Sequence, residues 1–137
     1  MTGKERVIKT INLESVDRTP WVPFVGSHGG YLINKTATEY LKSSECIIEG
    51  VSKAIETYQP DGIPVMFDLQ IEAEVLGCEL KWADENPPAV VSHPLSNGTK
   101  LEDLKIPAAT DGRIKIALDA ARELRKQNPD VALYGLI

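Results

Sequence analysis

The sequence lacks the basic charge and the long apolar runs that would assign it to several common classes of protein. Its 137 residues carry 15 lysines and arginines against 20 aspartates and glutamates, a formal net charge of −5. Nucleic acid is therefore not an expected partner, because neutralising phosphates requires a basic face. No apolar run approaches the roughly 20 residues that cross a bilayer, and residues 1–6 lack the apolar stretch of a signal peptide. We expect no membrane partner.

Cysteine is also scarce, with Cys46 and Cys78 the two in the chain. Two cysteines make no disulfide framework, so we expect a reducing, cytoplasmic setting. Neither cysteine has a second Cys or a His at the spacing that zinc sites use. We therefore expect this chain to bind no cofactor of its own, and we interpret His93, which precedes Pro94, as structural.

The sequence does contain an alternation of helical and strand patterns, which indicates an α/β fold. Apolar residues at helical spacing predict amphipathic helices, and Thr with Glu three residues later, at Thr2 and at Thr36, forms a capping box. Short apolar runs predict strands, and two such runs around a proline-rich turn predict a hairpin. The expected helices are 4–12, 45–58 and 113–127, the last one capped by Asp111; the expected strands are 21–25, 63–67 and 131–137; the expected hairpin spans 79–92.

The stretch from Asp61 to Cys78 organises the rest of the chain. A turn signal leads into the apolar run 63–67, Asp68 stands where that run ends, and a short helical stretch follows with Gly77 at its C-cap. Groups that do chemistry in α/β folds sit at the carboxyl ends of parallel strands. Asp68 is therefore the candidate catalytic residue. The alternative is that Asp68 serves as the N-cap of the helical stretch.

A glycine-rich segment after the first expected strand is the second candidate region. Residues 26–30 contain three glycines around His28, which gives backbone freedom and close approach to a ligand. We predict that His28, Gly29 and Gly30 bind substrate and face the same cavity as Asp68. We predict that Gln70, two residues after Asp68, binds substrate as well. The alternatives are a flexible turn for 26–30 and a solvated surface position for Gln70. The dinucleotide-binding order of glycines is absent.

Several motifs resemble the uroporphyrinogen decarboxylase superfamily. They are Arg18-Thr19-Pro20, Met66-Phe67-Asp68 with Leu76-Gly77, and the segment 101–107. The resemblance implies a TIM (β/α)₈ barrel, with residues 1–20 as a helical extension, residues 21–137 as the first three β/α units, and the hairpin as an insertion. Such a barrel needs roughly 250 residues. We therefore expect residues 1–137 to be an incomplete barrel domain, the N-terminal part of a longer protein.

The resemblance implies two activities. One branch of the superfamily decarboxylates uroporphyrinogen in porphyrin biosynthesis, where an aspartate matching Asp68 faces the pyrrole N–H groups of the substrate. The other moves methyl groups from a methylcobamide to a thiol, with zinc held by His and Cys ligands from later strands, which lie outside this chain. The decarboxylase pattern carries two arginines that pair with substrate carboxylates, and the matching residues 25–32 contain neither. This absence favours the methyltransferase branch.

The expected partners follow from the same resemblance: a tetrapyrrole or corrinoid substrate, or a corrinoid protein. Uroporphyrinogen decarboxylation is the alternative activity. A third alternative is a truncated, non-catalytic fragment that acts as an assembly module. In any of these cases we expect the isolated chain to be inactive and to self-associate, because a partial barrel leaves sheet edges open.

Overall fold

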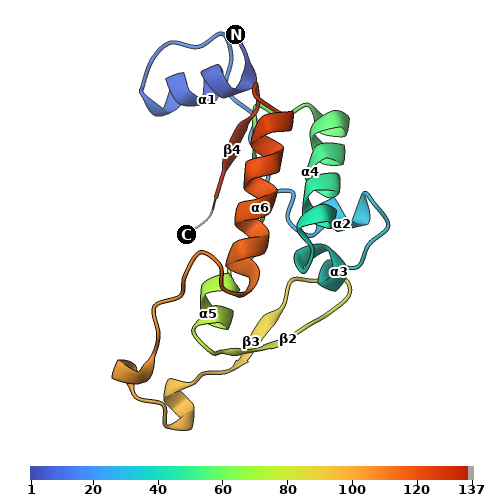
Figure 1. The fold of residues 1–137 in the computed structure, drawn as a ribbon. Helices are drawn as coiled ribbons and strands as arrows, with labels where there is room; N and C mark the ends of the chain where they lie inside the picture. The colour runs from blue at the N-terminus through green and yellow to red at the C-terminus, as the bar shows by residue number, and fades with distance from the viewer. Residues whose placement is uncertain (136–137) are drawn as a thin grey trace.

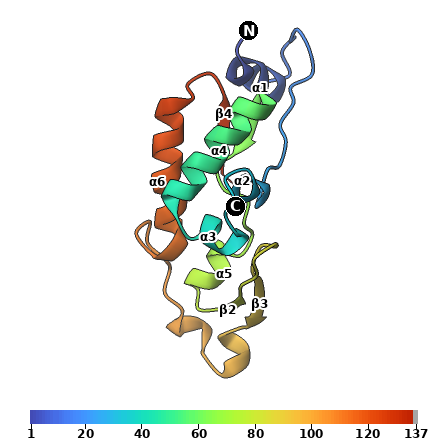
Figure 2. The ribbon, with the colours of Figure 1, turned by 90° about the vertical axis from the view of Figure 1, so that its right-hand side faces the viewer.

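The computed structural model describes residues 1–135 as an elongated mixed α/β structure (Figure 1). Helix α1 (Gly3–Ile11) lies at one end, and a hairpin of β2 (Glu79–Lys81) and β3 (Ala89–Ser92) lies towards the other, where the turns that follow β3 form the tip. Two long helices, α4 (Ser44–Tyr58) and α6 (Gly112–Gln127), run side by side between these ends, as both views show (Figures 1 and 2). None of the helices in residues 1–135 is long and apolar enough to cross a membrane.

The centre of the fold is a parallel pair of short strands. Strand β1 (Gly62–Pro64) pairs with β4 (Ala132–Tyr134), with Gly62 opposite Ala132. The Val65 N–H extends the pairing by donating to the Tyr134 carbonyl at 3.0 Å. Parallel strands require a long crossover, and here it contains α5 (Ile71–Val75), the hairpin and α6. The predicted strands at 63–67 and 131–137 are confirmed but shorter; residues 136–137 lie outside the described range.

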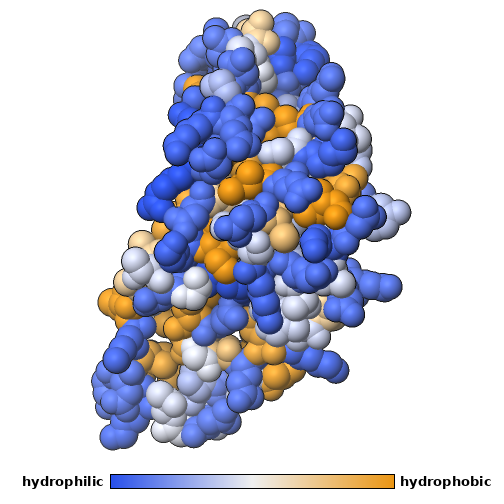
Figure 3. All heavy atoms as spheres, turned by 45° about the vertical axis from the view of Figure 1, so that its right-hand side comes forward, coloured by the Kyte–Doolittle hydropathy of each residue, from blue (hydrophilic) through white to orange (hydrophobic). Residues whose placement is uncertain are grey.

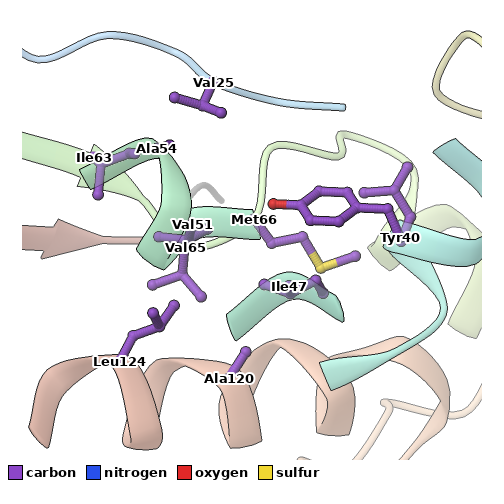
Figure 4. Packing of buried hydrophobic residues seen from close by; sticks show 11 residues of the cluster. Val25, Tyr40, Ile47, Val51, Ala54, Ile63, Val65, Met66, Ala120 and Leu124 are labelled. Atoms are coloured by element: carbon purple, nitrogen blue, oxygen red, sulfur yellow. The ribbon is translucent and has the colours of Figure 1, made fainter. Parts of the chain in front are cut away.

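The core lies between this strand pair and the two long helices (Figure 4). Figure 4 shows Ala120 and Leu124 of α6 pointing towards the strands, with the apolar stripe of α4 beside them. The fully enclosed core side chains include Tyr40, Leu41, Ile47, Val51, Ile63 and Leu124. The predicted helices 45–58 and 113–127 are confirmed, and their apolar stripes face this core.

The two capping boxes form as predicted. Thr2 and Glu5 close the first turn of α1, and Thr36 and Glu39 close the first turn of α3 (Ala37–Leu41). Helix α1 is attached to the strands through its backbone, since the Lys4 N–H donates to the Asp130 carbonyl at 2.8 Å. The helical extension therefore covers the end where β1 and β4 begin.

The predicted hairpin is confirmed and is fixed to α3. The Ala37 N–H donates to the Asp84 carbonyl at 2.6 Å, and the Thr38 hydroxyl donates to the Ala83 carbonyl at 2.8 Å. Two short 3₁₀ turns, Leu95–Asn97 and Leu101–Asp103, then lead towards α6. These bonds hold the insertion against the rest of the chain.

Two sequence predictions are wrong. Residues 21–25 form no strand: the Trp21 carbonyl accepts one hydrogen bond, from the Asp61 N–H at 2.9 Å, and Pro23 has no N–H to continue a ladder. The first of the three expected β/α units therefore lacks its strand in the described part of the chain. The glycine-rich segment 26–30 is no open loop, because its second half enters a one-turn helix, α2 (His28–Tyr31).

Candidate functional site

Asp68 lies beyond the carboxyl end of β1, as expected, but its carboxylate is enclosed by protein. Its Oδ1 accepts a hydrogen bond from the Gln70 N–H at 2.8 Å, and its Oδ2 pairs with Nη1 of Arg113. The side chain has 0% exposed surface. Asp68 is not the N-cap of α5, since Gln70 occupies that position. Asp68 instead turns the chain into α5 and joins it to α6.

Arg113, in the first turn of α6, makes two further contacts at this rim, near the carboxyl end of β1. Its Nε donates to Oε2 of Glu74 in α5 at 2.5 Å, and its guanidinium carbon lies 4.7 Å from the centre of the Trp82 ring. Its Nη2 is the one buried side-chain nitrogen or oxygen without a hydrogen-bond partner among residues 1–135. We call Asp68, Glu74, Trp82 and Arg113 the Arg113 cluster.

Asp111 occupies the predicted N-cap position of α6. Its side chain accepts a hydrogen bond from the Ala108 N–H and caps no amide of α6.

An apolar hollow of about 270 Å³ opens beside Asp68. It lies between α5 and α6 and is lined by Val65, Met66, Asp68, Ile71, Glu72, Ile114, Ala117, Leu118, Ala121 and Gly135. A smaller hollow of about 110 Å³ has Asp68 and Gln70 in its wall together with Phe67, Leu69 and Pro87. Asp68 and Gln70 therefore line one hollow near the carboxyl end of β1, and their role in a site stays a prediction.

His28 is not brought to Asp68. Its Nε2 lies 2.7 Å from the Tyr58 hydroxyl, and its ring stacks on Tyr31. It lines a separate hollow of about 210 Å³ with Trp21, Pro23, Phe24, Val25 and Tyr58. The expectation that His28 and Asp68 face one cavity is therefore not met in the described structure. One link between the two regions is aromatic, with the centres of the Phe24 and Phe67 rings 5.1 Å apart.

Gly29 and Gly30 are buried under Tyr40 and α4. A Cβ on Gly30 would lie 2.8 Å from the Tyr40 Cβ, and a Cβ on Gly29 would overlap the Tyr40 hydroxyl. Their lack of a side chain is needed for the packing of α2 against α3 and α4. Neither glycine offers its backbone to a ligand in this arrangement, which corrects the open-loop interpretation.

Cys78 and His93 form a contact that sequence spacing did not indicate. Their Sγ and Nδ1 atoms lie 3.6 Å apart where the hairpin begins and ends. Across residues 1–135 no three His, Cys, Asp or Glu side chains gather as metal ligands would. A structural zinc site uses four ligands and a catalytic one uses three. This pair alone does not fit a zinc ion.

A second ionic group lies at the other end of β1. The buried carboxylate of Asp61 pairs with Arg6 of α1, accepts from Arg18 Nη1 at 2.5 Å and accepts from the Trp21 N–H at 2.8 Å. Burial alone would raise the pKa of Asp61, but the hydrogen bonds from Arg18, Trp21 and Arg6 outweigh it and hold the pKa below its usual value. A further hydrogen bond from Arg6 lowers the pKa of Asp17. This group fixes α1 to the strands.

The comparisons with known proteins agree with this architecture. The chain is 27% identical over 140 residues to methylcobamide:CoM methyltransferase MtbA of Methanosarcina acetivorans, covering 98% of this chain and 41% of that protein. It is 38% identical over 79 residues to methylated-thiol–coenzyme M methyltransferase of Methanosarcina mazei, covering 54% of this chain and 21% of that protein. The chain thus spans about two-fifths of the length of MtbA.

A solved structure and a family model extend the likeness. A methyltransferase from Methanosarcina mazei superposes with a TM-score of 0.85 at 24% identity, over 98% of this chain and 42% of that one, which shows a shared fold. The model of the uroporphyrinogen decarboxylase (URO-D) family matches residues 2–137. With the match running over nearly every residue, the chain belongs to the uroporphyrinogen decarboxylase family.

Proposed function

We propose that this protein takes part in methyl transfer from a methylcobamide to a thiol. The observation that carries the proposal is the match to a methylcobamide:CoM methyltransferase, which is 27% identical and covers 98% of this chain. The sequence supports the same choice, because residues 25–32 lack the arginines of the decarboxylase pattern. In the structure Gly29 and Gly30 of this segment pack on Tyr40, and the segment offers neither arginine nor lysine to pair with the carboxylates of an acidic tetrapyrrole.

The proposal places these residues in a TIM barrel. Strands β1 and β4 are parallel neighbours joined by a helical crossover, the unit from which such barrels are built. The hollow between α5 and α6 lies near the carboxyl end of β1, where barrel enzymes bind their substrates. In this proposal the remaining barrel strands lie outside these residues, and Asp68 and Gln70 belong to the rim of the site.

The proposed partners are a corrinoid cofactor or corrinoid protein and a thiol acceptor, in the cytoplasm. The zinc of the methyltransferase branch would be held outside this chain, since Cys78 and His93 are too few to form its site. We therefore assign no step of the reaction to a metal bound by these residues.

The test is an assay of the complete protein in which these residues stand, with the 137-residue chain beside it. Methylcobalamin and 2-mercaptoethanesulfonate are the probes. The thiol loses its proton to solvent, and the thiolate sulfur attacks the methyl carbon. The cobalt–carbon bond breaks with its electron pair on cobalt, and cob(I)alamin and the methyl thioether form. The expected result is a thiol-dependent change in the cobalamin absorbance with the complete protein. Conversion of uroporphyrinogen to carbon dioxide and coproporphyrinogen, without methyl transfer, would contradict the proposal.

A further inference from the structure

The Asp68 carboxylate has no free oxygen exposed to a substrate. Both oxygens have protein partners, the Gln70 N–H and Arg113 Nη1, and the side chain has no exposed surface. The Arg113 side chain is 5% exposed. A substrate in the neighbouring hollow would meet other atoms of this rim before it met the carboxylate oxygens.

One guanidinium connects four segments at this rim. Arg113 belongs to α6, Asp68 follows β1, Glu74 belongs to α5, and Trp82 follows β2. Helix α5 has five residues, none of them fully buried. A helix of this length is unstable by itself in water. Its position over the hollow therefore depends on contacts with neighbours, and the Arg113–Glu74 bond is the charged one among them.

We propose that Asp68 and Arg113 form a positioning pair. Arg113 holds Asp68 and α5 at the rim of the hollow, and Asp68 affects the site by fixing α5 rather than by touching the substrate. The kinetic part of the test rests on the proposed methyl transfer, whereas the structural part does not depend on any activity.

Electrostatics gives this proposal a distinctive signature. Removing one member of a buried ion pair leaves an uncompensated charge and is strongly destabilising, whereas neutralising both members together is often tolerated. Asp68→Asn would leave the Arg113 charge with Glu74 alone, and Arg113→Gln would leave the Asp68 charge buried. The double variant removes both charges and places a side-chain amide at each of the two positions. The Glu74 side chain, 30% exposed, can turn to water in that variant.

Hydrogen exchange measures the positioning directly. We expect each single variant to exchange the hydrogen-bonded amides of residues 74–78 faster by about tenfold or more, because their local stability depends on the pair. In the double variant the rate should return to within a few-fold of the wild-type chain. The amides of α4 should keep their wild-type rates throughout. The control is Lys115→Gln, which breaks the exposed Lys115–Asp119 pair on the same helix and should leave the exchange rates of residues 74–78 unchanged.

The fluorescence of Trp82 provides a second readout of the same rim. In a Trp21→Phe background Trp82 is the single tryptophan, and its ring lies against the Arg113 guanidinium. We expect the emission to shift in both single variants and to return towards the wild-type spectrum in the double variant. Unchanged exchange and emission in Arg113→Gln would overturn the proposal. So would faster exchange spread equally over α4.

Kinetics separates positioning from substrate contact. If Asp68 acts through position, the double variant recovers most of the kcat lost in either single variant, with KM for the thiol close to wild type. If Asp68 touches the reacting groups, Asp68→Asn and the double variant are equally impaired, which overturns the proposal. Absence of methyl transfer in the wild-type protein would refute the proposed function, and the exchange result would then decide the positioning pair by itself.

Discussion

Buried charge is concentrated at the two ends of one short strand. Arg6, Asp61, Asp68 and Arg113 are the buried charged residues of the described range, and they form two pairs. Asp61 precedes β1 and pairs with α1, and Asp68 follows β1 and pairs with α6. Each pair joins the strand to a helix distant in sequence. The two carboxylates therefore determine where the helices meet the sheet.

The first prediction concerns Asp61. Asp61→Asn should lower the free energy of unfolding at pH 7 by about 3 kcal/mol, because it removes the buried one of the two anionic partners of Arg6. Since the folded pKa of Asp61 is lowered, its stabilisation is fully present above the unfolded value of about 4 and is lost as the pH falls through the folded pKa. The difference between wild type and variant should therefore shrink below about pH 4. Urea unfolding across pH 3–7 measures this.

The control for Asp61 is Asp119→Asn on α6. Asp119 also pairs with two cations, Lys115 and Arg122, but this group is on the surface. Exposed pairs contribute at most about 1 kcal/mol. If Asp61→Asn and Asp119→Asn lose the same free energy of unfolding at pH 7, burial of the Asp61 carboxylate does not strengthen its ion pairs, which contradicts the prediction.

The second prediction concerns metal binding by Cys78 and His93. We expect the purified chain to hold much less than one equivalent of zinc, because two ligands give weak binding compared with the four of a structural site. Elemental analysis after gel filtration measures the content, with Cys46→Ser as the control and Cys78→Ser as the informative variant. One zinc per chain that disappears in Cys78→Ser would contradict this expectation.

At the scale of elements, close helix contact depends on Gly50 in the middle of α4. The third prediction is that Gly50→Ala lowers the melting temperature, because the new Cβ would lie 2.5 Å from the Gly29 carbonyl oxygen and 2.6 Å from the Tyr40 ring. Overpacking costs about 1–3 kcal/mol, which exceeds the roughly 1 kcal/mol that alanine gains over glycine in a helix. Thermal unfolding followed by circular dichroism measures it. Gly135→Ala, where the Cβ meets open space, should leave the melting temperature unchanged.

Elements with local signals were predictable from the sequence. The capping boxes at Thr2 and Thr36 each lie within four residues. The end of α5 is a Schellman motif, in which Gly77 has a φ of +98° and the Cys78 N–H donates to the Ala73 carbonyl. Such bonds form between neighbours in the chain, so the residue types alone indicate them.

The contacts that build the candidate site were not predictable in the same way. Arg113 lies 45 residues from Asp68, and their pairing depends on how α6 returns to the sheet. The available signal was positional: in a βα unit the next helix begins near the rim where the previous strand ended. The strand predicted at residues 21–25 was wrong although its signal was local. The apolar run is typical of a strand, but Pro23 has no N–H to donate to a ladder.

At the scale of the whole molecule, the parallel sheet is small and open. Within residues 1–135 it contains two strands, and β4 pairs on one side, with β1. Apolar atoms reach the surface between hydrophilic ones on the face in Figure 3. Large exposed side chains occur near the ends of the strand region, including Phe24 at 66% and Leu69 at 67%. Open strand edges and apolar surface are both relieved by contact with more polypeptide.

The fourth prediction is that the isolated 137-residue chain self-associates and has no methyltransferase turnover. A two-stranded sheet is marginal in water, and the open side of β4 offers N–H and C=O groups to another chain. Light scattering with gel filtration should give a mass above the 15.0 kDa of one chain and rising with concentration. Phe24→Ser should reduce the association by removing apolar surface beside Phe67, whereas Leu13→Ser, exposed at the end of α1, should not. A 15.0 kDa species that transfers methyl groups would contradict the prediction, because a two-stranded sheet would then suffice for a site that barrels assemble from several strand ends.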